Sequence, residues 1–560
     1  MTAADPSVTL ENSAATSTPD AHATVLDRVD QFLERAGERL NPILVKEARQ
    51  ALKSRQFVVT FTLLLLCGWG WSLLGIAMLS PGVYYAPAGP FMLAGYYFVL
   101  AVPLLVVAPF AAFRSLAAER EDGTYELLSI TALSPRLIVT GKLGSAVLQM
   151  IVYYSALSPC LVFTYILRGV DIVSIGLVLF WTFFISVGMS VVGLLVATAT
   201  RSRNWQVLLS VVFLLVLLVV GLVWSSAVVQ ILAAGGSLGY DDPDFWLAMA
   251  ACLTAYVAFV VLFLQAAAAQ LTFVSANRST RLRITMAVHQ LLWLGWIVYF
   301  WLRFQQGDLL YAAVLFPAVY WAFMGALLTG EAPQLSPRAR RSLPQSFLGR
   351  VFLTWFNPGS GVGYAFTVAN LVSLTVVLGI LNAVAVWMGV ESQVMRSERW
   401  MMFSLMLVSY VAAYLGTGRL LLMFVRRFIW GGLAMSFVIN LFLAAMGAIV
   451  PFLVQLTLLG VTMAEEYTLL QATNWVWTIT AILDDKLMGE DLAVYVIVPA
   501  AAAFIFLVNL ILAAREVAAE REQTPQRVLE DELQLHPEKA PKPAGPQSPW
   551  DYDASTEPAV

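Results

Sequence analysis

The residues best suited to chemistry lie between Ala118 and Lys142, in the segment AEREDGTYELLSITALSPRLIVTGK. Charged residues make up only 12% of the chain, yet acids and bases are concentrated here between two long apolar runs. The segment also holds a Gly-Thr pair that suits a turn, a short apolar stretch and a Ser-Pro pair. This combination is suited to binding, and we expect the segment to meet a soluble partner.

Residues that usually carry catalysis or bind metals are scattered along the chain. The three cysteines, at 67, 160 and 252, lie in separate apolar runs and are expected to be packing thiols. The aspartates within 241–244 could hold a cation, although a solvated acidic loop is the simpler interpretation. We therefore expect no metal site, no cofactor in this chain and no enzyme. A net charge of −3 gives no indication of a nucleic-acid partner.

The composition indicates an all-α polytopic membrane protein. Of 560 residues, 59% are hydrophobic, and the mean hydropathy is +0.76. A helix of about 20 apolar residues crosses a bilayer, and continuous rather than alternating apolar runs exclude strands. We predict twelve spans, near 57–79, 91–113, 143–167, 172–200, 205–234, 245–271, 284–302, 309–329, 364–389, 400–424, 429–458 and 493–513.

The charges in the predicted loops set an orientation, since loops rich in Lys and Arg stay on the cytoplasmic side. Positive residues precede the first span and recur in alternate loops, whereas 80–90, 241–244 and 465–491 are uncharged or acidic. Both termini are therefore predicted to be cytoplasmic. The polar first 40 residues contain no signal-peptide core, so we expect the first span to insert uncleaved.

The twelve spans divide into six plus six. We predict a cytoplasmic segment at 1–40, disordered except for a short amphipathic helix, and a six-span domain at 41–275. A second six-span domain follows at 276–515, and then a disordered tail at 516–560. In both halves the largest inside loop follows the second span, at 114–142 and at 330–363, which is a weak internal repeat. In the second loop, residues 357–359 (Asn-Pro-Gly) are a degenerate relic of the first loop or simply a turn.

An amphipathic helix is predicted just before the first span. Asn41 suits its N-cap and Pro42 its first position. At about 100° per residue one face is apolar and the opposite face is cationic. The apolar face comprises Leu44, Ala48, Ala51 and Leu52, and the cationic face Lys46, Arg49 and Lys53. Such a helix can lie in the membrane interface, although the cations alone could serve only to fix the topology.

The loop after the second span is expected to contain a second short helix. Gly123 allows a tight turn, Thr124 can cap a helix, and Leu127 and Leu128 would project from it. The Ser-Pro pair that ends at Pro135 would stop this helix. Exposed leucines on a short cytoplasmic helix favour a binding partner, although they could instead pack on the ends of the protein's own spans.

These two segments together resemble the permease of a type 2 ABC transporter, most clearly over residues 41–150. In that family the first segment corresponds to the elbow helix and the second to the cytoplasmic loop that holds the coupling helix. The resemblance assigns Lys46, Glu47, Arg49 and Lys53 to the elbow helix. It assigns Glu119, Arg120, Gly123, Thr124, Glu126, Leu127 and Leu128 to the coupling loop, with Pro135, Gly141 and Lys142 leading into the third span.

The resemblance implies a transport subunit that works with a separate ATPase. The chain has no Gly-x-x-x-x-Gly-Lys-Ser/Thr motif, so ATP would bind to that partner and not here. The family implies export across the cytoplasmic membrane, contact with lipids, and a homodimer or a second permease subunit. The second half lacks the Glu-Arg-x-x-Gly-Thr pattern, so it is either a degenerate permease half or an added six-span domain. The substrate stays open.

Two other classes of function compete with this interpretation. An ion-coupled carrier usually needs ionisable residues deep in its spans, and the predicted span cores contain almost none. His289 and Arg419 are expected near span ends. A membrane scaffold or assembly factor on a transporter-like fold would show the same spans without transport.

Overall fold

The computed structural model describes most of the chain as helix. The described residues are 41–82, 85–123, 133–199, 203–233, 238–273, 275–305, 308–332, 335–341, 346–387, 398–429, 431–459, 467–487, 492–519 and 526–536. No strand occurs among them. The helix predicted within residues 25–40 lies outside this part of the chain.

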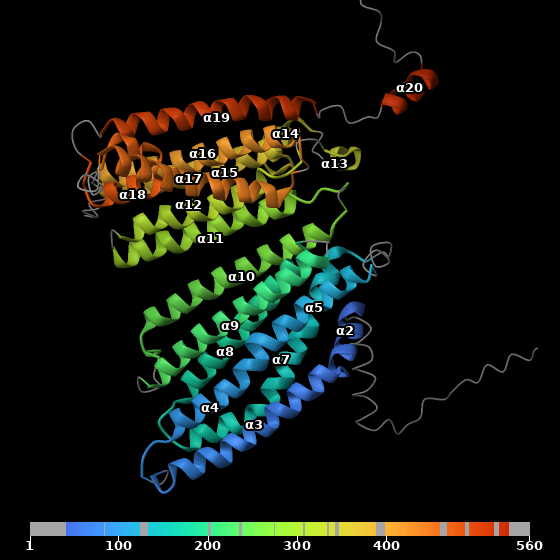
Figure 1. Cartoon of the computed structure of the whole chain (residues 1–560), viewed down its shortest axis with the longest axis vertical. Helices are drawn as coiled ribbons and strands as arrows, with labels where there is room; N and C mark the ends of the chain where they lie inside the picture. The colour runs from blue at the N-terminus through green and yellow to red at the C-terminus, as the bar shows by residue number, and fades with distance from the viewer. Residues whose placement is uncertain are drawn as a thin grey trace, which may run out of the picture. The chain divides into compact units, whose positions relative to one another are not determined.

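Among the described residues, twelve helices are long and apolar enough to cross a membrane, as the sequence predicts (Figure 1). The second span is a continuous helix built from α4 (Gly89–Val102), a π-helical turn η2 (Pro103–Val107) and α5 (Ala108–Glu121). The others are α3 (Arg55–Leu79), α7 (Pro135–Ile166), α8 (Ile172–Ala197), α9 (Arg203–Ala233), α10 (Pro243–Leu271), α11 (Thr280–Phe304), α12 (Asp308–Leu328), α15 (Ser360–Trp387), α16 (Glu398–Val425), α17 (Leu433–Leu459) and α19 (Val494–Ala519).

The two spans that flank the first large loop are longer than predicted, which corrects the boundaries of that loop. The second span continues to Glu121 rather than ending near 113, and the third begins at Pro135 rather than near 143. The prediction ended each span at its first charged residue. Ala, Leu, Arg and Glu are good helix formers, so the helix of the second span continues past the apolar run. Ser134 and Pro135 provide the N-cap and first position of α7. The helix that they were predicted to stop lies outside the described residues.

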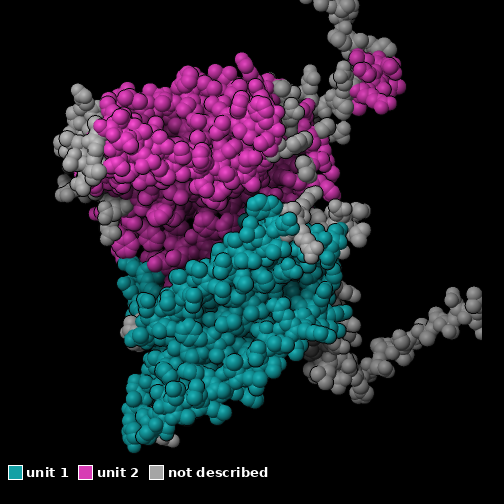
Figure 2. Space-filling view, in the orientation of Figure 1, with its two compact units in different colours: residues 1–246, 266–268 teal, residues 247–265, 269–560 magenta. Residues whose placement is uncertain are grey.

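The chain divides into two compact units (Figure 2). Unit 1 comprises residues 1–246 and 266–268, and unit 2 comprises 247–265 and 269–560. The division falls within α10, whereas the sequence predicts a boundary at 275. In unit 1, α7 is central and packs against α2, α3, α4, α5 and α8. In unit 2, α16 is central and packs against α12, α15, α17, α18 and α19.

Shorter helices lie outside the spans. They are α2 (Pro42–Leu52), α13 (Pro337–Arg341), α14 (Phe347–Leu353), the 3₁₀ turns η3 (Thr354–Phe356) and η5 (Leu469–Thr473), α18 (Trp475–Leu483) and α20 (Gln526–Leu535). Helix α20 corrects the prediction of a tail without structure over 516–560. Its sequence, QRVLEDELQL, has helix-forming residues and a helical apolar period, which the average composition of the tail conceals.

Candidate functional site

The predicted coupling residues lie within residues 122–134, which join α5 to α7, and on the two helices that flank this segment. Glu119 and Arg120 are in the last turn of α5 and not in a loop. Pro135, Gly141 and Lys142 are in the first turns of α7. Thr124, Glu126, Leu127 and Leu128 lie outside the described residues.

A buried lysine brings the two predicted segments together. The Lys142 side chain is 1% exposed, and its Nζ lies 3.0 Å from Oε1 of Glu119 and 3.1 Å from Oε1 of Glu47. It also donates a hydrogen bond to the Ser115 carbonyl oxygen at 3.1 Å. A buried ammonium is stable when it is paired and hydrogen-bonded in this way. One cation therefore joins α2, α5 and α7 beside the predicted loop.

Helix α2 begins as the sequence predicts and packs closely on α7. The Asn41 side chain accepts a hydrogen bond from the Ile43 N–H at 3.0 Å and donates one to the Leu137 carbonyl at 2.6 Å. Gly141 and Gly144 make room for α2, because a Cβ on either residue would lie within 3 Å of Ile43 or Leu44. The apolar face of α2 is thus partly covered by α7. The predicted cationic face, Lys46, Arg49 and Lys53, is exposed.

Two further residues fix the end of α5. The Arg120 guanidinium donates to the Thr198 carbonyl at 2.7 Å, just beyond the C-terminus of α8. A cation is favourable there because the last carbonyls of a helix have no partner within it. Gly123 has φ +70°, a left-handed conformation that ends the helix and that glycine adopts without strain. The base of the predicted loop is therefore held by α2, α7 and α8.

A second buried cation lies in unit 2, one residue before the predicted span 284–302. Arg283 of α11 is 0% exposed and pairs with Glu331, just after α12, at 2.6 Å. Its guanidinium also donates to the carbonyls of Trp355, Asn357 and Gly359. Glu331 in turn accepts the Gly359 N–H at 2.8 Å. Residues 357–359 thus form a turn that Arg283 and Glu331 hold against the start of α15.

A third buried cation joins α16 to α19. Arg419 is 0% exposed, pairs with Glu516 at 2.6 Å and donates to Oδ1 of Asn509 at 2.8 Å. Glu516 also accepts the Gly361 N–H at 3.2 Å. The sequence analysis missed both Arg–Glu pairs. The signal that could have found them is an arginine in or next to an apolar run combined with a glutamate at the end of another run.

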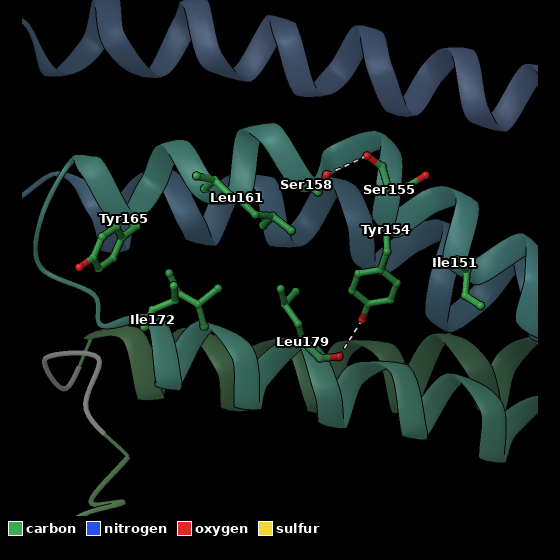
Figure 3. Close-up of a pocket in the computed structure, with 10 residues that line it drawn as sticks. Ile151, Tyr154, Ser155, Ser158, Leu161, Tyr165, Ile172 and Leu179 are labelled. Carbon is green, nitrogen blue, oxygen red and sulfur yellow. Dashed lines mark hydrogen bonds between the residues drawn. The ribbon is translucent and has the colours of Figure 1, made fainter. Parts of the chain in front are cut away.

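An apolar groove of about 450 Å³ runs between α7 and α8 (Figure 3). Tyr154 crosses it and donates to the Leu179 carbonyl at 2.8 Å, while Tyr165 and Ile172 line one end. No charged side chain lines this groove. The residues that the structure describes also contain no cluster of His, Cys, Asp and Glu that could hold a metal.

The chain was compared with protein families, curated proteins and solved structures. No protein-family model matches the chain, and neither the curated proteins nor the solved structures contain a significant match.

Proposed function

We propose that this chain is the permease subunit of an ABC-type exporter that uses ATP hydrolysis by a separate P-loop ATPase. The observation that carries the proposal is the contact of Lys142 with Glu47 and Glu119. Residues assigned to the elbow helix and to both flanks of the coupling loop by resemblance meet at one buried cation. Twelve apolar helices supply the membrane domain that such a subunit needs.

The geometry supports a path by which movement of the loop could reach the spans. Closure of the ATPase would displace residues 122–134, which are attached directly to α5 and α7. Because Lys142 pairs with carboxylates on α2 and α5, these helices would move with α7 rather than slide past it. Such rigid-body movement of packed helices is one way in which membrane proteins change between two states.

The buried charges favour this proposal over an ion-coupled carrier. Lys142, Arg283 and Arg419 each contact at least one carboxylate, and the arginines also bind backbone carbonyls. A buried cation that is fixed by a carboxylate stabilises helix contacts, whereas a coupling site must release and rebind its ion. By its resemblance the subunit would export its substrate across the cytoplasmic membrane.

Purification from the native host in mild detergent tests the proposal. We expect a P-loop ATPase to co-purify with the chain and to be lost when Leu127 and Leu128 are both replaced by Asp. Leu535→Asp, an equivalent change at an exposed leucine of α20, is the matched control and should retain the ATPase. A complex that contains no ATPase and hydrolyses no ATP would overturn the permease assignment and favour a carrier or a scaffold.

A further inference from the structure

The segment between α12 and α15 combines positive charge with exposed apolar side chains. It contains four arginines, at 338, 340, 341 and 350, and the sequence has no Asp or Glu from 332 to 390. Leu348 and Phe352 lie one turn apart on α14 and are 65% and 68% exposed. Trp355 follows in η3 and is 43% exposed. Three large apolar residues are thus left uncovered in a stretch of sequence whose only charges are positive.

Short tethers hold these residues close to the ends of two spans. Trp355 precedes the first residue of α15 by five positions, which limits their separation to roughly 18 Å even for extended chain. Its carbonyl oxygen accepts a hydrogen bond from the buried Arg283 guanidinium at 3.1 Å. Glu331, at the other end of the segment, pairs with the same guanidinium. The segment is therefore fixed beside Arg283 of α11, the end of α12 and the start of α15.

We propose that residues 346–356 form an interfacial membrane anchor on the cytoplasmic side. Leu348, Phe352 and Trp355 insert between the acyl chains, and the positive charge of the surrounding sequence favours a leaflet with anionic headgroups. Charge complementarity favours this occupant, since cytoplasmic leaflets carry negative lipids and attract basic segments next to a span. Tryptophan also prefers the membrane–water boundary. The assignment depends on the orientation of the spans and not on the proposed transport function.

The test places a fluorescent probe on the apolar face in the full-length protein. Cys67, Cys160 and Cys252 are first replaced by Ala, which leaves a chain without cysteine. Single cysteines are then introduced by Phe352→Cys or Leu348→Cys, labelled with an environment-sensitive fluorophore, and placed in nanodiscs that contain anionic phosphatidylglycerol. Using two positions one turn apart protects the test against a single variant that fails to fold. Arg338→Cys, on the exposed polar part of the segment, is the control.

Lipids brominated on their acyl chains then report the depth of each probe. We expect probes at 352 and 348 to emit at shorter wavelength and to lose most of their fluorescence to brominated lipid. The probe at 338 should keep most of its fluorescence and respond instead to iodide in the water. Probes at 352 and 348 that are quenched by iodide and not by brominated lipid would overturn the anchor. Protection that appears only when a soluble ATPase is added would assign the face to a protein partner instead.

Discussion

Individual charged side chains hold the first unit together at the base of the predicted loop. Lys142 is buried, and its ammonium contacts two glutamates that are also largely buried. Loss of one glutamate leaves the ammonium with the other, whereas loss of both leaves a buried charge with a single carbonyl. The two carboxylates should therefore depend on each other energetically, although one lies on α2 and the other on α5.

A double-mutant cycle measures this dependence. We expect Glu47→Gln and Glu119→Gln to cost little separately and together to destabilise the protein by about 3–5 kcal/mol, because the ammonium is then unpaired. Adding Lys142→Met to the double variant should recover most of the loss. Unfolding is followed in detergent by heat or denaturant. Glu121→Gln, a change at a carboxylate only 3.8 Å from the half-exposed Arg114, is the control and should be nearly neutral. If the destabilisation of the double variant equals the sum of the two single values, the two glutamates do not share Lys142.

The backbone at Gly123 provides a second prediction at this scale. Its φ of +70° is unfavourable for other residues, while the space around its Cα is open. Gly123→Ala should therefore cost about 1–2 kcal/mol through conformation alone. Gly176→Ala, also in open space but within α8, should instead stabilise by roughly 0.5–1 kcal/mol. Thermal unfolding of both variants is the measurement. If the two substitutions change the unfolding temperature in the same direction, Gly123 does not have the left-handed conformation at the end of α5.

At the scale of elements, local signals predict much of the fold and fail where distant residues meet. Asn41 and Pro42 predict the start of α2 because capping depends on neighbouring residues. Each of the twelve predicted runs contains a helix among the described residues, because the length and composition of a run are also local properties. The predicted end of the second span and the predicted start of the third are wrong by about eight residues. A hydropathy profile scores each charged residue without its partner, so it ends a span where a paired charge begins. Lys142 can be buried between helices because Glu47, 95 residues away in sequence, neutralises its charge.

The seam between α2 and α7 yields a prediction of its own. A Cβ on Gly141 would lie 2.8 Å from the Cβ of Ile43, close to the α2 backbone, whereas one on Gly144 would meet only the tip of Leu44. Gly141→Ala should therefore displace α2 at a cost of about 1–3 kcal/mol, and Gly144→Ala should cost less because the leucine tip can rotate away. Hydrogen exchange of the α2 amides, measured by mass spectrometry, should rise more in the first variant. Equal exchange in both would contradict close packing at Gly141.

Both units contain an ion pair between a glutamate and a buried cation, but the residues and helices differ. In each unit a glutamate at the end of a long helix pairs with a buried cation: Glu119 of α5 with Lys142, and Glu331, just after α12, with Arg283. The partners differ, since the lysine lies on α7, which follows α5, and the arginine lies on α11, which precedes α12. The sequence predicted large inside loops at 114–142 and at 330–363, but it could not predict these pairs, because the helix and the residue type of the cation differ between them.

Comparing a variant of each pair tests whether both predicted six-span domains take part in coupling. Arg283→Lys keeps the charge but loses the planar fork that reaches Glu331 and the carbonyls of Trp355 and Gly359. We expect it to destabilise the protein by about 1.5–3 kcal/mol, the value of hydrogen bonds to a charged group. If the second loop anchors the chain to lipid, ATP hydrolysis and transport per folded molecule should stay coupled.

The matched variant in the first half is Glu119→Gln, for which we expect the opposite result. It retains the Lys142–Glu47 pair and most of the stability, yet it loosens α5 from α7 beside the loop proposed to bind the ATPase. ATP hydrolysis by the purified complex should continue while transport in proteoliposomes falls. If Arg283→Lys also separates hydrolysis from transport, both loops transmit movement and the chain acts as a pseudo-dimer of two permease halves. If neither variant does so, the buried pairs are structural, and coupling does not pass through them.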